Sequence, residues 1–181
     1  MILYHGTTLE KARRILASGV IRAEIERDFS ANEYFSGTTN GYVYLTHSLH
    51  TAYVYGNIKV IDSECAEKYV CIFKIDTQID QLVADFDELR DVMRMDVSDD
   101  LSAEESLRLC GCARTASDVN VEGGEYIIIP STINRDYDGA DRTACLNLSA
   151  LKTNARCNNT EDVYAEIFAR WGWQDASEIL L

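Results

Sequence analysis

Three residues far apart in this chain could share one chemical task, because each lies at the end of an expected β-strand. His5 ends the apolar segment 2–5 and precedes Gly6, a residue type that lets backbone and ligand approach closely. Tyr44 lies in the strand-like segment 41–46, and Glu125 opens an isoleucine-rich segment. Strand ends of this kind can line one cleft, which would then offer a hydrogen-bonding ring, an aromatic surface and a fixed negative charge.

The elements around these residues can be read from local patterns. Thr7-x-x-Glu10 forms a capping box, apolar residues then repeat at helical spacing, and Gly19 occupies a C-cap position. The polar segment 24–41 predicts a long loop of the kind that often covers a cleft. Ser48 to Tyr55 predicts a short helix that Gly56 should stop.

The remaining elements favour an α+β fold. Residues 67–76 are apolar on both faces and predict a central strand, and Pro130 should end the strand 125–129. Helices are expected at 85–95 and 102–113, a strand at 142–149 and a last helix from Thr160. No repeat or linker divides the chain, so we expect a single domain over 1–181, with 131–181 the part least defined by its pattern.

Charge and hydropathy restrict the partners. The formal net charge is −13 and the sequence pI is about 4.6, which disfavours nucleic acid as the partner. Residues 85–105 hold nine carboxylates and only two arginines. We interpret this segment as a solvated surface facing away from the cleft, with a docking face for a basic protein as the alternative. No apolar run nears 18 residues and the chemistry begins at residue 5, so neither a membrane span nor a cleavable signal is expected, and the location should be cytoplasmic.

The six cysteines do not predict a metal site. None has the CxxC spacing, Cys110-Gly111-Cys112 is too tight for a usual zinc pair, and no histidine cluster accompanies them. We expect reduced thiols that mostly fill the core, and no metal cofactor.

The segments LYHGT, VYLT followed by S-x-x-T-A, and EYIII occur in an order and spacing that resemble a known family. The resemblance is to the His-Tyr-Glu branch of the ADP-ribosyltransferase superfamily, which includes poly(ADP-ribose) polymerases and diphtheria toxin. It covers residues 1–130. It implies split central β-sheets flanked by helices around a cleft for NAD, which would be the co-substrate.

The resemblance also implies site residues. Glu125 matches the catalytic glutamate, His5 the histidine that binds the adenosine ribose, and Tyr44 the tyrosine that lines the nicotinamide pocket. The carboxamide of nicotinamide would bind the Gly6 backbone and the Thr51 hydroxyl. Further NAD-binding candidates are Thr7 in the first motif, Arg22 for the pyrophosphate or adenosine, and a second aromatic residue, for which the alignment leaves Tyr53 and Tyr55 open and favours Tyr55.

These features predict a mono-ADP-ribosyltransferase of the bacterial or phage toxin type that modifies an intracellular macromolecule, protein more than nucleic acid. The alternatives are an NAD glycohydrolase, a modifier of RNA or DNA including NAD-dependent RNA 2′-phosphotransferases, and a non-catalytic acidic binding or inhibitor module. His5 and Gly123 stand where the arginine-modifying branch has Arg and Gln or Glu. No base for the acceptor is evident, and Glu122 and Asp118 are the candidates.

Overall fold

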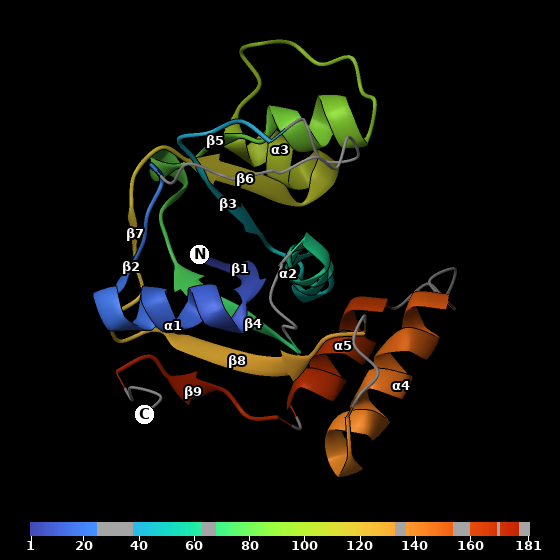
Figure 1. The fold of residues 1–181 in the computed structure, drawn as a ribbon. Coiled ribbons are helices and arrows are strands. Elements are labelled where there is room, and N and C mark those ends of the chain that lie inside the picture. The colour runs from blue at the N-terminus through green and yellow to red at the C-terminus, as the bar shows by residue number, and fades with distance from the viewer. Residues whose placement is uncertain (25–37, 63–67, 133–136, 154–159, 170, 178–181) are drawn as a thin grey trace.

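The computed structural model describes residues 1–24, 38–62, 68–132, 137–153, 160–169 and 171–177 as an α+β arrangement (Figure 1). A seven-stranded sheet has the order β5-β6-β3-β1-β4-β8-β9, and every pairing between described strands is antiparallel. Its strands are β1 (Ile2–Thr8), β3 (Val43–Thr46), β4 (Tyr69–Asp76), β5 (Val83–Ala84), β6 (Cys112–Thr115), β8 (Glu125–Pro130) and β9 (Gln174–Asp175).

The other elements cover this sheet. A small antiparallel ribbon joins β2 (Val20–Ile21) to β7 (Val119–Asn120). The helices are α1 (Leu9–Ser18), α2 (Leu49–Asp62), α3 (Ala103–Cys110), α4 (Gly139–Thr153) and α5 (Thr160–Ala169), with the 3-10 turn η2 (Ile79–Gln81) and the π-helix η3 (Asp87–Val92). No helix among the described residues is long and apolar enough to cross a membrane.

The central strand β1 pairs much more extensively with one neighbouring strand than with the other. It pairs with β4 along its whole length, from Ile2 opposite Asp76 to Thr8 opposite Val70. With β3 it pairs at only one position, Tyr4 opposite Thr46. The sheet is therefore nearly split between β1 and β3. We call the region where these two strands separate, from His5 and Tyr44 onward, the fork.

Helix α2 lies against β1 and β4 at unusually close range, and two glycines allow it. A Cβ atom at Gly6 would lie 1.8 Å from the backbone oxygen of Ala52, and one at Gly56 would lie 2.3 Å from Val70 Cγ1. The expectation that Gly56 stops the helix is wrong, since α2 continues to Asp62. Gly56 is an interior residue of the helix, and glycine is needed there because a side chain would collide with the sheet.

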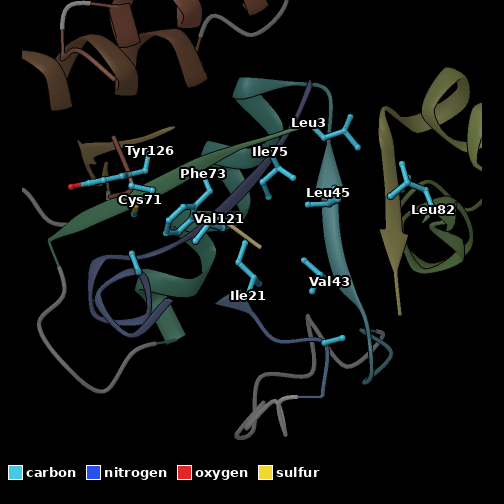
Figure 2. Close-up of a cluster of buried hydrophobic side chains, with 14 of the residues drawn as sticks. Leu3, Ile21, Val43, Leu45, Cys71, Phe73, Ile75, Leu82, Val121 and Tyr126 are labelled. Carbon is cyan, nitrogen blue, oxygen red and sulfur yellow. The ribbon is translucent and has the colours of Figure 1, made fainter. Parts of the chain in front are cut away.

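Two buried clusters occupy the two faces of the sheet. The first gathers side chains of β1, β3, β4 and β8 with Ile21 of β2 and Val121, the residue after β7 (Figure 2), and Ala12 and Leu16 of α1 join it. The second packs α2, α4 and α5 against the opposite face, and its aromatic members Tyr53, Tyr164 and Phe168 contact one another. Burial of apolar surface on both faces explains why β4 reads as continuously apolar.

The caps of two helices follow the sequence closely. Thr8, one residue after the expected cap, accepts a hydrogen bond from Lys11 N at 3.3 Å, and Gly19 ends α1 in the left-handed conformation with φ of 71°. The second capping box, Ser102 with Glu105, is confirmed. These local bonds satisfy amides and carbonyls that the helix itself leaves unpaired.

Three sequence expectations fail where tertiary contacts decide. The segment 142–149 is not a strand but part of α4, whose buried residues Ala144, Cys145 and Leu148 share one helical face. The helix expected at 102–113 ends at Gly111, and the buried strand β6 begins at once. The helix expected at 85–95 is the shorter π-helix η3.

Strands of two residues such as β9 carry no periodic signal, so the sequence does not reveal them.

Substitution of Gly6 by alanine should destabilise the protein more than its size suggests, because the new methyl group meets rigid backbone of α2. We expect a loss of about 3 kcal/mol in the free energy of unfolding, the upper range for overpacking. Gly41→Ala is the matched control, since its Cβ meets nothing within 4 Å and only its φ of +83° is strained. That strain costs about 1–2 kcal/mol. Urea unfolding of both variants measures the difference, and equal losses would contradict the close contact.

Candidate functional site

The fork brings together two of the predicted residues. His5 on β1 and Tyr44 on β3 are 39 positions apart, yet the His5 Nδ1 atom lies 3.0 Å from the backbone oxygen of Tyr44. Both residues are half-buried. A ring nitrogen at this distance can donate a hydrogen bond to the carbonyl, which fixes the imidazole where β1 and β3 separate.

Glu125 lies in the same sheet but in a different row of side chains. It pairs with Lys74, which pairs with Tyr4, so these three residues project from one face. His5 pairs with Phe73 and therefore projects from the other face. The register thus places Glu125 two strands from β1, on the face that α2 covers, and does not bring its carboxylate to the His5 ring.

The Glu125 carboxylate has a cationic partner that the sequence did not reveal. Lys74 Nζ lies 2.6 Å from Glu125 Oε2, with the two side chains 33% and 46% exposed. The same ammonium lies 5.6 Å from the centre of the Trp173 ring, which stacks on Tyr4. Exposure to water limits the stabilisation that this ion pair gives, but it keeps a charged, solvent-accessible carboxylate in a defined place.

The residues expected to hold the carboxamide lie where α2 meets β1. The Gly6 backbone faces the carbonyl of Ala52, and Thr51 is the preceding residue of α2. Thr51 N donates to Ser48 Oγ at 3.0 Å, which fixes the first turn of the helix. Thr7 is buried, whereas Arg22 is exposed just after β2.

The two tyrosines that the sequence left open occupy different environments. Tyr53 is 2% exposed, packs against Tyr164 and Phe168, and donates to the backbone oxygen of Pro130 at 2.7 Å. It belongs to the second core cluster. Tyr55 is only partly buried and its hydroxyl donates to Glu88. Of the two rings, Tyr55 is the one left outside that core cluster.

Tyr44 is part of a dense polar cluster. Its hydroxyl donates a short hydrogen bond to Asp87 Oδ2, and Arg114 Nη1 lies 3.1 Å from Asp87 Oδ1. Asp87 also accepts from the amide and the hydroxyl of Thr39, at 2.6 and 2.8 Å. The guanidinium of Arg114 stacks over the Tyr42 ring at 4.1 Å, and its Nε atom is buried without a hydrogen-bond partner.

These contacts correct one expectation about the acidic segment 85–105. Its later part is exposed, as the Arg90–Asp99 pair illustrates with a 93% exposed aspartate. Its first part is not a surface that faces away, because Asp87 and Glu88 accept hydrogen bonds from Tyr44 and Tyr55, two of the predicted site residues. The sequence does not reveal this, because the carboxylates of the run have no local feature that distinguishes one from another. The one available signal was Arg114, a charge inside an otherwise uncharged strand.

Burial changes the proton affinity of the three carboxyl groups in this region. It raises the pKa of Asp85 to about 6 and also raises the pKa of Glu88. Burial acts in the same direction on Asp87, but hydrogen bonds from Thr39 and Tyr44 and the charge of Arg114 outweigh it and lower the pKa of Asp87. Asp87 is therefore the carboxylate whose charge this cluster stabilises.

The described residues offer no group of three or more His, Cys, Asp or Glu side chains that could hold a metal ion. Four cysteines lie in the described part of the chain, at 71, 110, 112 and 145, and all are free thiols. No protein-family model matches this chain, and a comparison with curated proteins finds no similar sequence.

Asp85→Asn should stabilise the protein at neutral pH but not at pH 4. Because the pKa of Asp85 is raised in the folded state, that state keeps a proton that the unfolded chain releases, and stability is lost as pH rises through about 6. The variant avoids that loss, and its advantage should grow to roughly 1–3 kcal/mol above pH 7. Asp85 Oδ1 caps Glu88 N at 3.1 Å, a role that asparagine can keep.

The control for this measurement is Asp96→Asn, an exposed carboxylate of the same acidic segment. Chemical denaturation at pH 4 and pH 7.5 compares the two variants with the unmodified protein. An advantage of Asp85→Asn that is equal at both values would contradict the burial of an ionised Asp85.

Proposed function

We propose that this protein is an NAD-dependent mono-ADP-ribosyltransferase of the His-Tyr-Glu type. The observation that carries the proposal is the fork, where the His5 ring contacts the Tyr44 carbonyl at 3.0 Å. The single paired position between β1 and β3 supports the proposal, because the two strands then separate beyond Tyr4 and Thr46. The motif residues come from three separate strands, β1, β3 and β8, of one sheet.

The proposal assigns a role in NAD binding to the groups around the fork. At Gly6 the backbone lies so close to the Ala52 carbonyl of α2 that no Cβ atom fits, and Thr51 and Tyr55 belong to the same helix. In the proposed site the Gly6 backbone and the Thr51 hydroxyl bind the carboxamide, and the rings of Tyr44 and Tyr55 line the nicotinamide. His5 binds the adenosine ribose. Aromatic rings hold nicotinamide without adding charge and exclude water from the reacting bond.

The proposed reaction breaks the glycosidic bond between nicotinamide and C1′ of its ribose. Nicotinamide leaves with the bonding electron pair, and the ribose gains positive charge as it approaches an oxocarbenium ion. The carboxylate of Glu125 stabilises that charge more in the transition state than in the ground state. A nucleophile of the acceptor then bonds to C1′ and releases its proton.

The acceptor is proposed to be a protein. A net charge of −13 opposes the approach of polyanionic nucleic acid and favours basic protein surfaces at low salt. The exposed carboxylates that follow η3, including Asp99, are the surface on which such a protein would first meet the enzyme.

Glu125→Gln should abolish turnover while NAD binding changes by only a few-fold, because the amide keeps the shape but loses the charge. Removal of one such electrostatic partner costs roughly 2.7–4 kcal/mol, or about 10²–10³ in kcat. Nicotinamide release from NAD measures turnover. Lys74→Gln is the matched control, since it breaks the same ion pair but leaves the carboxylate, and it should lose far less. Near-normal turnover of Glu125→Gln would exclude the mechanism.

His5→Ala should weaken NAD binding as well as turnover, because the imidazole acts on the bound ground state. We expect affinity to fall about tenfold, which corresponds to one hydrogen bond of ordinary strength. His47→Ala, an exposed histidine just after β3, is the control. Isothermal calorimetry with NAD tests this, and unchanged affinity in a folded His5→Ala protein would reduce His5 to a structural residue of the fork.

A further inference from the structure

Two consecutive carboxylates of η3 reach two tyrosines on different elements. Asp87 binds the Tyr44 hydroxyl of β3, and Glu88 binds the Tyr55 hydroxyl of α2. We propose that Asp87 and Glu88 are positioning residues that set the orientation of both pocket rings. This inference rests on the proposed function, because it assigns Tyr44 and Tyr55 to the nicotinamide pocket.

The contact at Asp87 is built to hold one geometry. Its Oδ1 atom accepts hydrogen bonds from the Arg114 guanidinium and the Thr39 hydroxyl. Its Oδ2 atom accepts hydrogen bonds from the Thr39 amide and the Tyr44 hydroxyl. Four donors on two oxygens leave the carboxylate little freedom to rotate. The side chains of Arg114 and Asp87 are only 9% and 16% exposed, so water cannot easily replace these bonds.

Arg114 is fixed in turn by its surroundings. It lies on β6 directly opposite Tyr44 of β3, and its guanidinium stacks on Tyr42. A buried arginine has high cost unless it is paired, so Asp87 and Arg114 require each other. The phenol of Tyr44 is thereby tied to a unit that spans β3, β6 and η3.

The π-helix itself is anchored so that both carboxylates face inward. Leu89 is fully buried, Asp85 Oδ1 accepts a hydrogen bond from Glu88 N at 3.1 Å, and Asp85 N donates a hydrogen bond to Ser106 Oγ at 3.0 Å. Ser106 Oγ donates to the backbone oxygen of Cys112 at 2.8 Å, which joins η3 to α3 and β6. Short π-helical turns occur frequently at functional sites. Here the anchored turn presents neighbouring residues to two separate tyrosines.

The test compares NAD affinity and turnover in Asp87→Asn and Glu88→Gln. Each variant should raise the Kd and KM for NAD about tenfold, the usual effect of losing one charge-assisted hydrogen bond, while kcat stays within about threefold. Asp76→Asn is the matched control, because it breaks an exposed 3.1 Å ion pair with the N-terminal ammonium group and has no role in the proposed site. Its Kd and KM should match those of the unmodified protein.

A double-variant cycle separates positioning from a general structural role. Tyr44→Phe removes only the hydroxyl and should raise the Kd for NAD to the level seen in Asp87→Asn. In the Tyr44→Phe background, Asp87→Asn should then add little, since the two changes break the same contact. A structural role through Thr39 and Arg114 would instead give the full loss in both backgrounds. Tyr55→Phe and Glu88→Gln form the second cycle.

Each outcome decides between the two proposals. An unmodified protein that neither binds NAD in calorimetry nor releases nicotinamide overturns the proposed function and this inference together. NAD binding that is normal in the unmodified protein and unchanged in folded Asp87→Asn and Glu88→Gln overturns the positioning role alone. If either carboxylate variant fails to fold, Tyr44→Phe and Tyr55→Phe carry the test, and unchanged NAD affinity in both overturns the inference.

Discussion

The close contact between α2 and β1 is the constraint on which the rest of this structure depends. At Gly6 the strand backbone and the carbonyl of Ala52 leave no room for a Cβ atom, and at Gly56 the helix meets Val70 in the same way. This contact places Thr51 and Tyr55 beside the first motif. It also fixes α2 on the face of the sheet that Glu125 shares, so the helix and the carboxylate strand are positioned by one packing interface.

The fork follows from an imbalance in the pairing of β1. Hydrogen bonding to β4 along the whole strand holds β1 firmly. Pairing to β3 occurs at a single position, so most of the β3-facing edge of β1 is not paired with β3. Where β1 and β3 separate, their backbone polar groups need hydrogen-bond partners other than the neighbouring strand. The His5 ring, which contacts the Tyr44 carbonyl, is one such partner. A sheet that is nearly divided can thus present ring and backbone polar groups to a ligand while remaining continuous through its neighbours.

The buried charges lie on the far side of the fork from Glu125. Arg114 and Asp87 are a desolvated pair that requires matched partners, whereas Lys74 and Glu125 are a partly exposed pair that water screens. The two pairs therefore have different physical consequences. The first fixes the orientation of Tyr44 and the position of η3, and the second leaves the Glu125 carboxylate accessible to solvent.

Much of the fold near the site was predictable because its signals are local. Short sequence patterns predicted four of its features: the strand that carries His5, the Ser102–Glu105 capping box, the C-cap at Gly19 and the strand that Glu125 opens. The same patterns predicted Tyr44 on a strand and Thr51 on a helix. Their assignment to NAD chemistry stays a prediction that rests on the motif order.

What the sequence by itself determined is the set of elements with strong caps and periodicity, because those interactions act within a few residues. Only the tertiary structure decided that 142–149 is helical, that α2 passes through Gly56, and that Asp87 and Glu88 point inward. Each of these outcomes depends on contacts between residues distant in sequence, such as Gly56 with Val70 and Asp87 with Arg114. A carboxylate in an acidic run has no local property that distinguishes a buried partner of an arginine from a solvated surface charge.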